Sequence, residues 1–292
     1  MKPGLEKTLI SMCWLSGFVL LGAVTILVGY LAYRGIPTLN RHLLFGDSPP
    51  LDAMLMKQQV FDGLFPAIVG TLALLAIAII IAVPIGVAAG IYMAEYGRGP
   101  VKKLFNLLFD ILAAIPSIVI GLCGLAVILI LHNRFEGRFV PCLLLSALSL
   151  AFLVMPYLIR TTQMALESVP PAIRLTAPAL GSSKLQNILL VLLPSCLPEI
   201  TGGIILATGR CAEDTAVIML TGAVTSAGIP RSFLDQYEAL PFYIYYISAQ
   251  YSGPAELASG FGAALILLII CGLLFTLAFW LRRRLTTSLL YR

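Results

Sequence analysis

Long apolar stretches separated by short polar segments dominate the hydrophobic pattern of the chain. Six of them reach about the 20 residues that a helix needs to cross a bilayer, at about 9 to 33, 64 to 94, 105 to 131, 140 to 160, 196 to 222 and 258 to 281. Backbone polar groups in lipid must be hydrogen-bonded within their own segment, so each stretch is expected to be helical. The pattern predicts an all-α membrane protein with six transmembrane helices.

Two of these stretches have special features. Lys2 and Lys7 precede the first stretch as in a signal peptide, but the apolar run is too long and no A-x-A cleavage site follows it. We therefore interpret it as a retained helix. The second stretch carries Pro66 near its start and Pro84 in its interior, which predicts a helix kinked near Pro84.

Charge supports the membrane assignment and predicts its orientation. Hydrophobic residues make up 59% of the chain and charged residues 11%, against about a quarter in soluble domains. With six spans both termini share one side, and that side holds twelve basic residues: Lys2, Lys7, Arg98, Lys102, Lys103, Arg160, Arg174, Lys184, Arg282, Arg283, Arg284 and Arg292. The opposite side holds six: Arg34, Arg41, Lys57, Arg134, Arg138 and Arg231. Because cytoplasmic loops carry the Lys/Arg excess, both termini are expected to be cytoplasmic.

Several classes of function lack a signal in the sequence. The basic residues behind the net charge of +5 do not form a stripe with interleaved aromatics, so nucleic acid is not expected as a partner. Membrane lipid is expected as a partner because of the apolar stretches. The cysteines show no C-x-x-C spacing and are interpreted as buried free thiols: Cys13, Cys123, Cys142, Cys196, Cys211 and Cys271. No phosphate-cradling G-x-x-x-x-G-K-[ST] loop, H-E-x-x-H pair or G-x-S-x-G elbow occurs, and His42 and His132 are placed in loops outside the membrane. We expect no ATP site, no metal and no catalytic residues in this chain.

The loop between the fourth and fifth stretches, at about 161–195, is the most informative one. From Arg174 to Pro194 it reads RLTAPALGSSKLQNILLVLLP, which predicts a helix, a stop at Gly181 and a second helix on the cytoplasmic side. The alternative is an amphipathic connector lying on the membrane surface.

This loop resembles the signature of ABC-importer permeases, E-A-A, three residues, G, nine residues, I-x-L-P. Gly181, Val191, Leu193 and Pro194 stand at the matching spacing, whereas Leu175, Thr176 and Ala177 replace E-A-A. The resemblance implies that the loop couples to a cytoplasmic ATPase through Arg174, Leu175, Thr176, Ala177, Leu180, Gly181 and Ser182.

Within the importers, the chain is similar to the PstA-like permeases of the phosphate (Pst) system. The similarity lies in GLFPAIVGTLALL at 63–75, residues 83–97, AAIPSIVIGL at 113–122 and LPFYIYYIS at 240–248. It implies a methionine-importer-like fold in a bacterial inner membrane, with residues 1–62 as a first helix and periplasmic loop and 63–292 as the permease core. The implied partners are a PstC-like second permease, a PstB-like ATPase dimer that binds ATP and Mg²⁺, and a PstS-like phosphate-binding protein.

Charged residues inside the fifth stretch are the candidate substrate site. Arg210 lies about 14 residues into it, roughly 20 Å deep, where a lone arginine is costly. Glu213 and Asp214 follow at i+3 and i+4, so an ion pair with Arg210 is expected. Phosphate permeases carry R-x-x-G-E-T here, which Arg210 and Thr215 match. We hypothesise that Arg210 either meets phosphate directly or switches its contact between phosphate and Asp214 as the path opens. The alternative is a permanent Arg210–Asp214 bridge.

Other polar residues have a structural and a functional interpretation. Thr71 and Ser117 either offer hydroxyls to the substrate path or serve helix packing beside Gly70 and Gly121. Asp110 is interpreted as a charge near the cytoplasmic start of the third helix, with a pair to Arg160 or a gate as alternatives. Aromatic and acidic residues at 235–251 form either an outer gate or docking surface, or an interfacial tyrosine belt.

Three other functions remain open at this point. A permease for another oxyanion, such as molybdate or sulfate, would share the coupling loop. A membrane enzyme acting on lipid could use Arg210, Glu213 and Asp214 as its polar site. A secondary transporter would normally show symmetry between its halves, which this sequence does not display.

Overall fold

The computed structural model describes residues 3–46, 63–135 and 140–290, and its regular elements there are helices. They are α1 (Pro3–Gly35), η1 (Ile36–Thr38), α2 (Arg41–Phe45), α4 (Phe65–Glu95), α5 (Gly99–Ala114), α6 (Ser117–Arg134), α7 (Leu143–Glu167), α8 (Pro171–Ala179), α9 (Lys184–Asn187), the π-turn η2 (Ile188–Leu192), α10 (Leu193–Glu213), α11 (Ala216–Thr221), α12 (Leu240–Gln250) and α13 (Pro254–Leu290). The prediction of an all-α chain is confirmed for the described residues.

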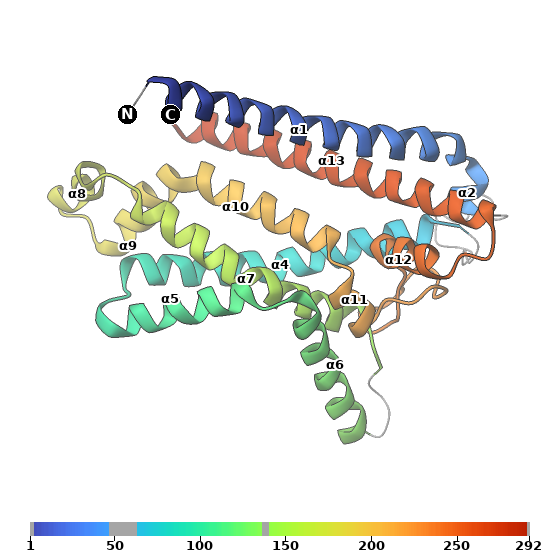
Figure 1. The fold of residues 1–292 in the computed structure, drawn as a ribbon. Helices are drawn as coiled ribbons and strands as arrows, with labels where there is room; N and C mark the ends of the chain where they lie inside the picture. Colours follow the sequence, from blue (N-terminus) through green and yellow to red (C-terminus); the bar gives the residue numbers. More distant parts are fainter. Residues whose placement is uncertain (1–2, 47–62, 136–139, 291–292) are drawn as a thin grey trace.

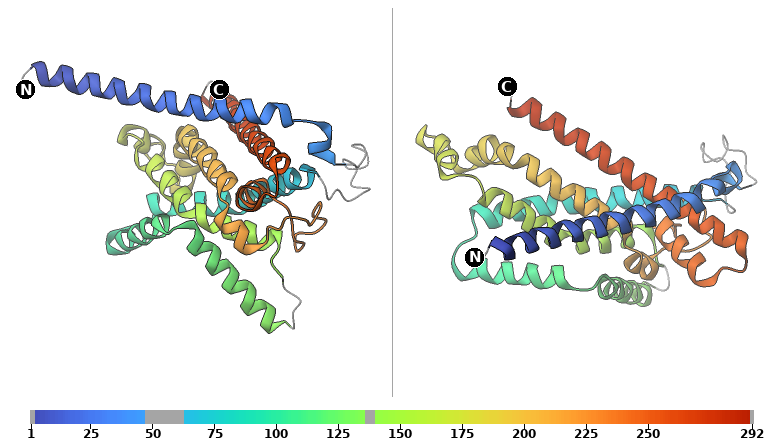
Figure 2. Two further views of the ribbon diagram at one scale, coloured as in Figure 1. Left: turned by 45° about the vertical axis from the view of Figure 1, so that its right-hand side comes forward. Right: turned by 45° about the horizontal axis from the view of Figure 1, so that its top comes forward.

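Within the described residues, six helical segments are long and apolar enough to cross a membrane, as predicted. They are Lys7–Thr38, Phe65–Glu95, Ser117–Arg134, Leu143–Glu167, Lys184–Glu213 and Pro254–Arg284. The start of α1 and the end of α13 lie at the same end of the molecule (Figure 1). α8 and α9 lie at that same end, and α2 and α12 lie at the other. The end of α1 packs on the start of α13, where Gly35 approaches Phe261 and Leu265, and the two helices then diverge, as Figure 2 shows. In the described ranges, the start of α1, the end of α13 and the predicted loop thus lie at one end of the molecule, which is consistent with the predicted topology.

The core is built around the α4–α7 pair. Small residues let the two helices approach closely: a Cβ on Gly86 would lie 2.7 Å from Leu158 Cβ, and one on Gly90 would lie 2.6 Å from Thr162 Cβ. Leu150 on α7 is fully buried in the same cluster. Without a hydrophobic effect between helices in lipid, such close van der Waals contact is what holds them together. α4 also runs unbroken through Pro84, so the predicted kink does not interrupt it.

The third predicted helix, 105 to 131, is wrong as a single element. Gly99–Ala114 and Ser117–Arg134 form two helices, because Ile115 is extended (ψ 131°) and Pro116 follows it. A proline disfavours the helical conformation in the residue before it and supplies no N–H, so the chain changes direction here. Figures 1 and 2 show α6 turning away from α5 and projecting from the helical body.

The fifth predicted helix, 196 to 222, is also wrong as a single element. α10 ends at Glu213, because Asp214 adopts an extended conformation (φ −75°, ψ 113°), and the short α11 begins at Ala216. The Asp214 carboxylate accepts a hydrogen bond from Val217 N at 2.9 Å. A carboxylate that bonds a backbone N–H three residues later starts a new helix and competes with continuation of the old one.

Smaller expectations need correction too. α7 continues to Glu167, so the loop after it is shorter than 161–195. Cys13 and Cys123 are exposed rather than buried, and His42 and His132 lie in α2 and the last turn of α6 rather than in loops. Of the charges used to predict orientation, Lys2, Lys57, Arg138 and Arg292 lie outside the described residues, as does the whole segment from 47 to 62.

Candidate functional site

Arg210 and Glu213 line a groove between α10, α12 and α13, with Leu31 of α1 at its edge. The groove has a volume of about 500 Å³, and apart from these two side chains its wall is largely apolar. Both charged residues are exposed in the last turn of α10. A Cβ on Gly209 would lie 2.5 Å from Phe275 Cζ, so the glycine lets α13 pass close to the arginine. A guanidinium and a carboxylate therefore face the interior of a largely apolar groove.

The expected ion pair between Arg210 and Asp214 is not formed. The prediction assumed one continuous helix, in which i and i+4 share a face, but the helix ends between them and Asp214 bonds Val217 N instead. Over the described ranges, the side chains of Arg210 and Glu213 make no ion pair or hydrogen bond. The five donors of the guanidinium are therefore available to a ligand.

The other predicted path residues do not join Arg210 in this groove. Thr71 is buried, donates to Ala67 O at 2.7 Å and accepts from Leu240 N at 2.9 Å, so its hydroxyl fastens α12 to α4. Ser117 is the first residue of α6, and Thr215 immediately precedes α11. α6 and α11 pack together, with a Cβ on Gly121 only 3.0 Å from Ala216 O. Ser117 and Thr215 thus belong to the two helix breaks, which this contact brings close together.

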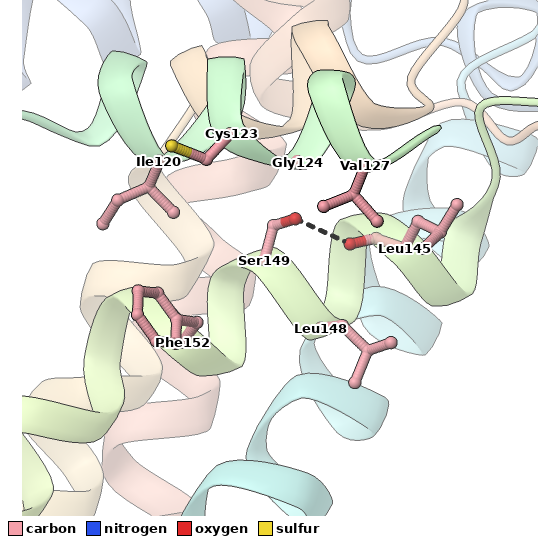
Figure 3. A pocket seen from close by; sticks show the side chains of 8 residues that line it. All are labelled: Ile120, Cys123, Gly124, Val127, Leu145, Leu148, Ser149 and Phe152. Carbon is pink, nitrogen blue, oxygen red and sulfur yellow. Dashed lines mark hydrogen bonds between the residues drawn. The ribbon is translucent and has the colours of Figure 1, made fainter. Parts of the chain in front are cut away.

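A second groove, between α6 and α7, offers no comparable chemistry. Figure 3 shows Ile120, Cys123 and Val127 of α6 on one side of it and Ser149 and Phe152 of α7 on the other. Its hydroxyl, Ser149 Oγ, donates to Leu145 O at 2.9 Å and is satisfied within its own helix. The groove is suited to apolar contact alone.

The segment after α7 has the predicted helix, glycine and helix. α8 ends at Ala179, and Gly181 adopts a left-handed conformation (φ 83°) that favours glycine. Ser183 and Gln186 then form a reciprocal capping box that starts α9. Leu175 of α8 and Leu180 in the turn after it are 63% and 89% exposed. The tip of the segment therefore presents apolar side chains at the end of the molecule where the termini lie.

Asp110 pairs with Arg160, which is one of the alternatives that the sequence allowed. Asp110 lies near the end of α5 and not at a helix start, because α5 begins at Gly99 and ends at Ala114, and its carboxylate pairs with Arg160 Nε at 2.9 Å. Lys102 pairs with Glu167 at 2.8 Å, and Gln163 bonds Glu167 at 2.9 Å between the two pairs. These contacts form a polar ladder that fastens α5 to α7.

The first residues of the segment at 235–251 have structural contacts. The Asp235 carboxylate accepts from Ser232 N at 2.8 Å and shapes the turn before it, and Tyr237 is fully buried rather than interfacial. Glu238 is buried as well and accepts hydrogen bonds from Ala227 N and Gly228 N at 3.0 and 2.8 Å. Burial raises the pKa of the Glu238 carboxyl to about 7, against the opposing effect of the two N–H donors.

The chain is similar in sequence to known transport permeases. The phosphate transport system permease protein PstA of Haemophilus influenzae is 30% identical over 253 residues, covering 86% of this chain and 85% of that protein. A PstA protein of Yersinia pestis is 37% identical over 160 residues, covering 54% of this chain and 52% of its own length. The probable ABC transporter permease YqgI of Bacillus subtilis is 27% identical and covers 94% of this chain and 93% of its own length. These similarities give no support to a lipid enzyme or a secondary transporter.

Solved structures agree on the fold. A bacterial ABC transporter that imports the acidic polysaccharide alginate contains a chain with a TM-score of 0.64 and 17% identity, covering 97% of this chain and 99% of that one. The inward-facing MetNI methionine transporter has a TM-score of 0.54 and 18% identity, covering 82% and 99%. The predicted methionine-importer-like fold is thus confirmed. A family model described as the inner membrane component of binding-protein-dependent transport systems matches residues 86–287. The chain therefore belongs to this family of ABC-importer permeases.

Proposed function

We propose that this chain is one of two permease subunits of an ATP-driven importer that moves inorganic phosphate into the cytoplasm. The observation that carries the proposal is the exposed guanidinium of Arg210 in a largely apolar groove, where it has no partner among the described residues. A cation in such surroundings is costly unless it serves a ligand or a path. The curated relatives named as phosphate permeases supply the choice of cargo.

Arg210 is the proposed phosphate contact. A planar guanidinium offers paired donors that match two oxygens of a tetrahedral oxyanion, and such charge-assisted bonds are strong where water is scarce. Glu213, one turn further on, repels the same anion and so prevents it from being held too tightly. Ser117 and Thr215 flank the path at the two helix breaks, whereas Asp214 and Thr71 act indirectly, by ending α10 and by holding α12.

The segment from Arg174 to Ser182 is the proposed contact with the ATPase. Exposed Leu175, at the first E-A-A position, and exposed Leu180, next to Gly181, provide an apolar surface for this contact. The chain itself takes no cofactor, and ATP and Mg²⁺ bind to a PstB-like ATPase dimer. A PstC-like permease completes the membrane pair, and a PstS-like protein delivers phosphate. Both termini then face the cytoplasm of a bacterial inner membrane.

The test is phosphate uptake by complexes carrying Arg210→Gln, which keeps a polar side chain but removes the charge. We expect a loss of about tenfold or more, since a charge-assisted contact is worth about 1.5–3 kcal/mol. Arg231→Gln is the matched control, because that exposed arginine lies in the outer loop and donates through its backbone N alone in the described hydrogen bonds. Wild-type uptake by Arg210→Gln in complexes that retain the ATPase would remove Arg210 from the path.

A competition assay on the same complexes separates the possible cargoes. If phosphate is the substrate, excess sulfate or molybdate leaves labelled phosphate uptake unchanged, whereas unlabelled phosphate abolishes it. Inhibition by sulfate or molybdate, with little uptake of phosphate itself, would instead identify a permease for another oxyanion.

A further inference from the structure

The helices α8 and α9 and the turn between them, residues 171–187, form the coupling segment. A carboxylate at the cytoplasmic end of α4 holds this segment in place. Glu95 is the last residue of α4, and its side chain is only 9% exposed. It forms an ion pair with Arg174 Nη1, and Arg174 Nη2 donates to Leu166 O near the end of α7. One guanidinium thus joins α8 to both helices of the central pair. Because the carboxylate is almost fully buried, loss of either partner would leave a costly unpaired charge.

The second arm of the coupling segment returns to the same place. The Lys184 ammonium bonds Glu95 O and lies 4.1 Å above the ring of Tyr96, a favourable cation–π contact. Asn187 Nδ2 donates to Arg174 O at 3.0 Å and so joins α9 to α8. Both arms of the segment therefore converge on Glu95, and neither contact involves the exposed tip around Leu180.

This arrangement suits the transmission of force. The tip projects from the body, whereas its base is fixed to the end of α4 by directional, partly desolvated bonds. α4 packs closely against α7 at Gly86 and Gly90, so a displacement of the base moves a stiff helix pair instead of bending a loop. In the importer signature the acidic residue stands in the loop, but here Leu175 occupies that position and the carboxylate belongs to α4.

We infer that Glu95 is a positioning residue, which holds the coupling segment on α4 through Arg174 and thereby links ATP hydrolysis to movement of the membrane helices. This inference rests on the proposed coupling function of the segment. Glu95 touches neither phosphate nor nucleotide in this scheme. Its removal therefore affects how much transport each ATP produces more than it affects the hydrolysis itself.

The experiment measures phosphate uptake and ATP hydrolysis in the same vesicles, using complexes that retain the ATPase. For Glu95→Gln we expect uptake per ATP to fall by at least about fivefold, the lower end of typical couplings between distant sites. Arg174→Gln should behave alike, and the charge-reversed double variant Glu95→Arg with Arg174→Glu should recover part of the ratio. Lys102→Gln is the matched control, since it breaks a different ion pair at the same end of the molecule.

A wild-type ratio of uptake to hydrolysis in Glu95→Gln would overturn the inference, as would a double variant no better than the worse single one. A separate measurement tests the underlying proposal. Leu180→Cys in otherwise wild-type complexes should cross-link to a cysteine introduced on the ATPase surface. Absence of that cross-link contradicts the coupling function itself, whereas a normal cross-link with an unchanged ratio contradicts the role of Glu95 alone.

Discussion

The Glu238 carboxylate is buried in the outer segment, which is the stretch between α11 and α12 at residues 222–239. It closes a turn there by accepting hydrogen bonds from the N–H groups of Ala227 and Gly228. Because its pKa is raised to about 7, the folded protein binds this proton more tightly than the unfolded chain does. The resulting stability is fully present below the ordinary glutamate pKa and is lost as the pH rises through about 7. This residue makes the outer segment sensitive to pH near neutrality.

Replacement of Glu238 by glutamine tests this argument. The amide oxygen still accepts both N–H bonds, but the side chain no longer ionises. We expect the midpoint of thermal unfolding of Glu238→Gln to change less than that of the wild type between about pH 5 and about pH 8. Asp235→Asn, which alters an exposed turn nearby, serves as the control. Equal pH dependence in wild type and Glu238→Gln would show that the carboxylate does not titrate in this range.

Gly70 is the residue at which α4 meets the outer segment most closely. A Cβ there would lie 2.1 Å from Glu238 O, and a backbone carbonyl cannot rotate away as a side chain can. We expect Gly70→Ala to lower the free energy of unfolding by about 1–3 kcal/mol, the usual cost of overpacking. Gly22→Ala on α1 is the matched control, because its Cβ would meet nothing within 4 Å. Thermal unfolding of the two variants in detergent gives the comparison, and equal midpoints would contradict the close approach.

At the scale of the element, α5 depends on its polar contacts with α7. None of its residues is buried, and Arg160 and Lys102 take part in its two ion pairs with α7. Both pairs are partly exposed, so each is worth at most about 1 kcal/mol. We expect Asp110→Asn to lower the free energy of unfolding by about that amount. The double variant Asp110→Asn with Arg160→Gln should lower it by less than the sum of the two single variants. A double-mutant cycle on thermal unfolding measures this, and strict additivity would show that the pair contributes nothing.

Helix breaks are the elements that the sequence predicts least well. Pro84 and Pro116 look alike in the sequence, yet α4 continues through Pro84, where it packs along α7, whereas the chain breaks at Pro116. Propensity does not distinguish them, because tertiary packing decides whether a lost backbone bond is tolerated. The break at Asp214 has a local signal, since Asp and Thr are favoured where helices begin. The length of the apolar stretch from 196 to 222 favours a single spanning helix and outweighs this signal.

The sequence predicts the parts of the candidate sites that depend on local chemistry, but not those that depend on contacts formed by folding. The helix, glycine and helix of the coupling segment follow from local chemistry at Gly181 and are confirmed. The Arg210–Asp214 contact depended on helix continuity and is wrong. Glu95 was missed, because a single glutamate at the end of an apolar helix carries no signal until folding brings Arg174, 79 residues away in sequence, beside it.

At the scale of the whole molecule, charge and shape both favour the proposed orientation, with the termini in the cytoplasm. The end that carries α8 and α9 also holds Lys102, Arg160 and the start of α1, and the other end carries α2, α12 and the outer segment. Only a chain inserted with the basic end in the cytoplasm satisfies the positive-inside rule and also presents the coupling segment to an ATPase. The proposed functions of Arg210 and Glu95 both require this orientation.

Two single cysteines test the orientation directly, in a background with the six native cysteines replaced by serine. Leu180→Cys and Phe233→Cys occupy exposed positions, 89% and 62% accessible, on the coupling tip and in the outer segment. In intact cells, a thiol reagent that does not cross membranes should label position 233 and leave position 180 unlabelled until the membrane is permeabilised. The reverse pattern would place the coupling segment outside, where no ATPase reaches it, and neither proposed function could then hold.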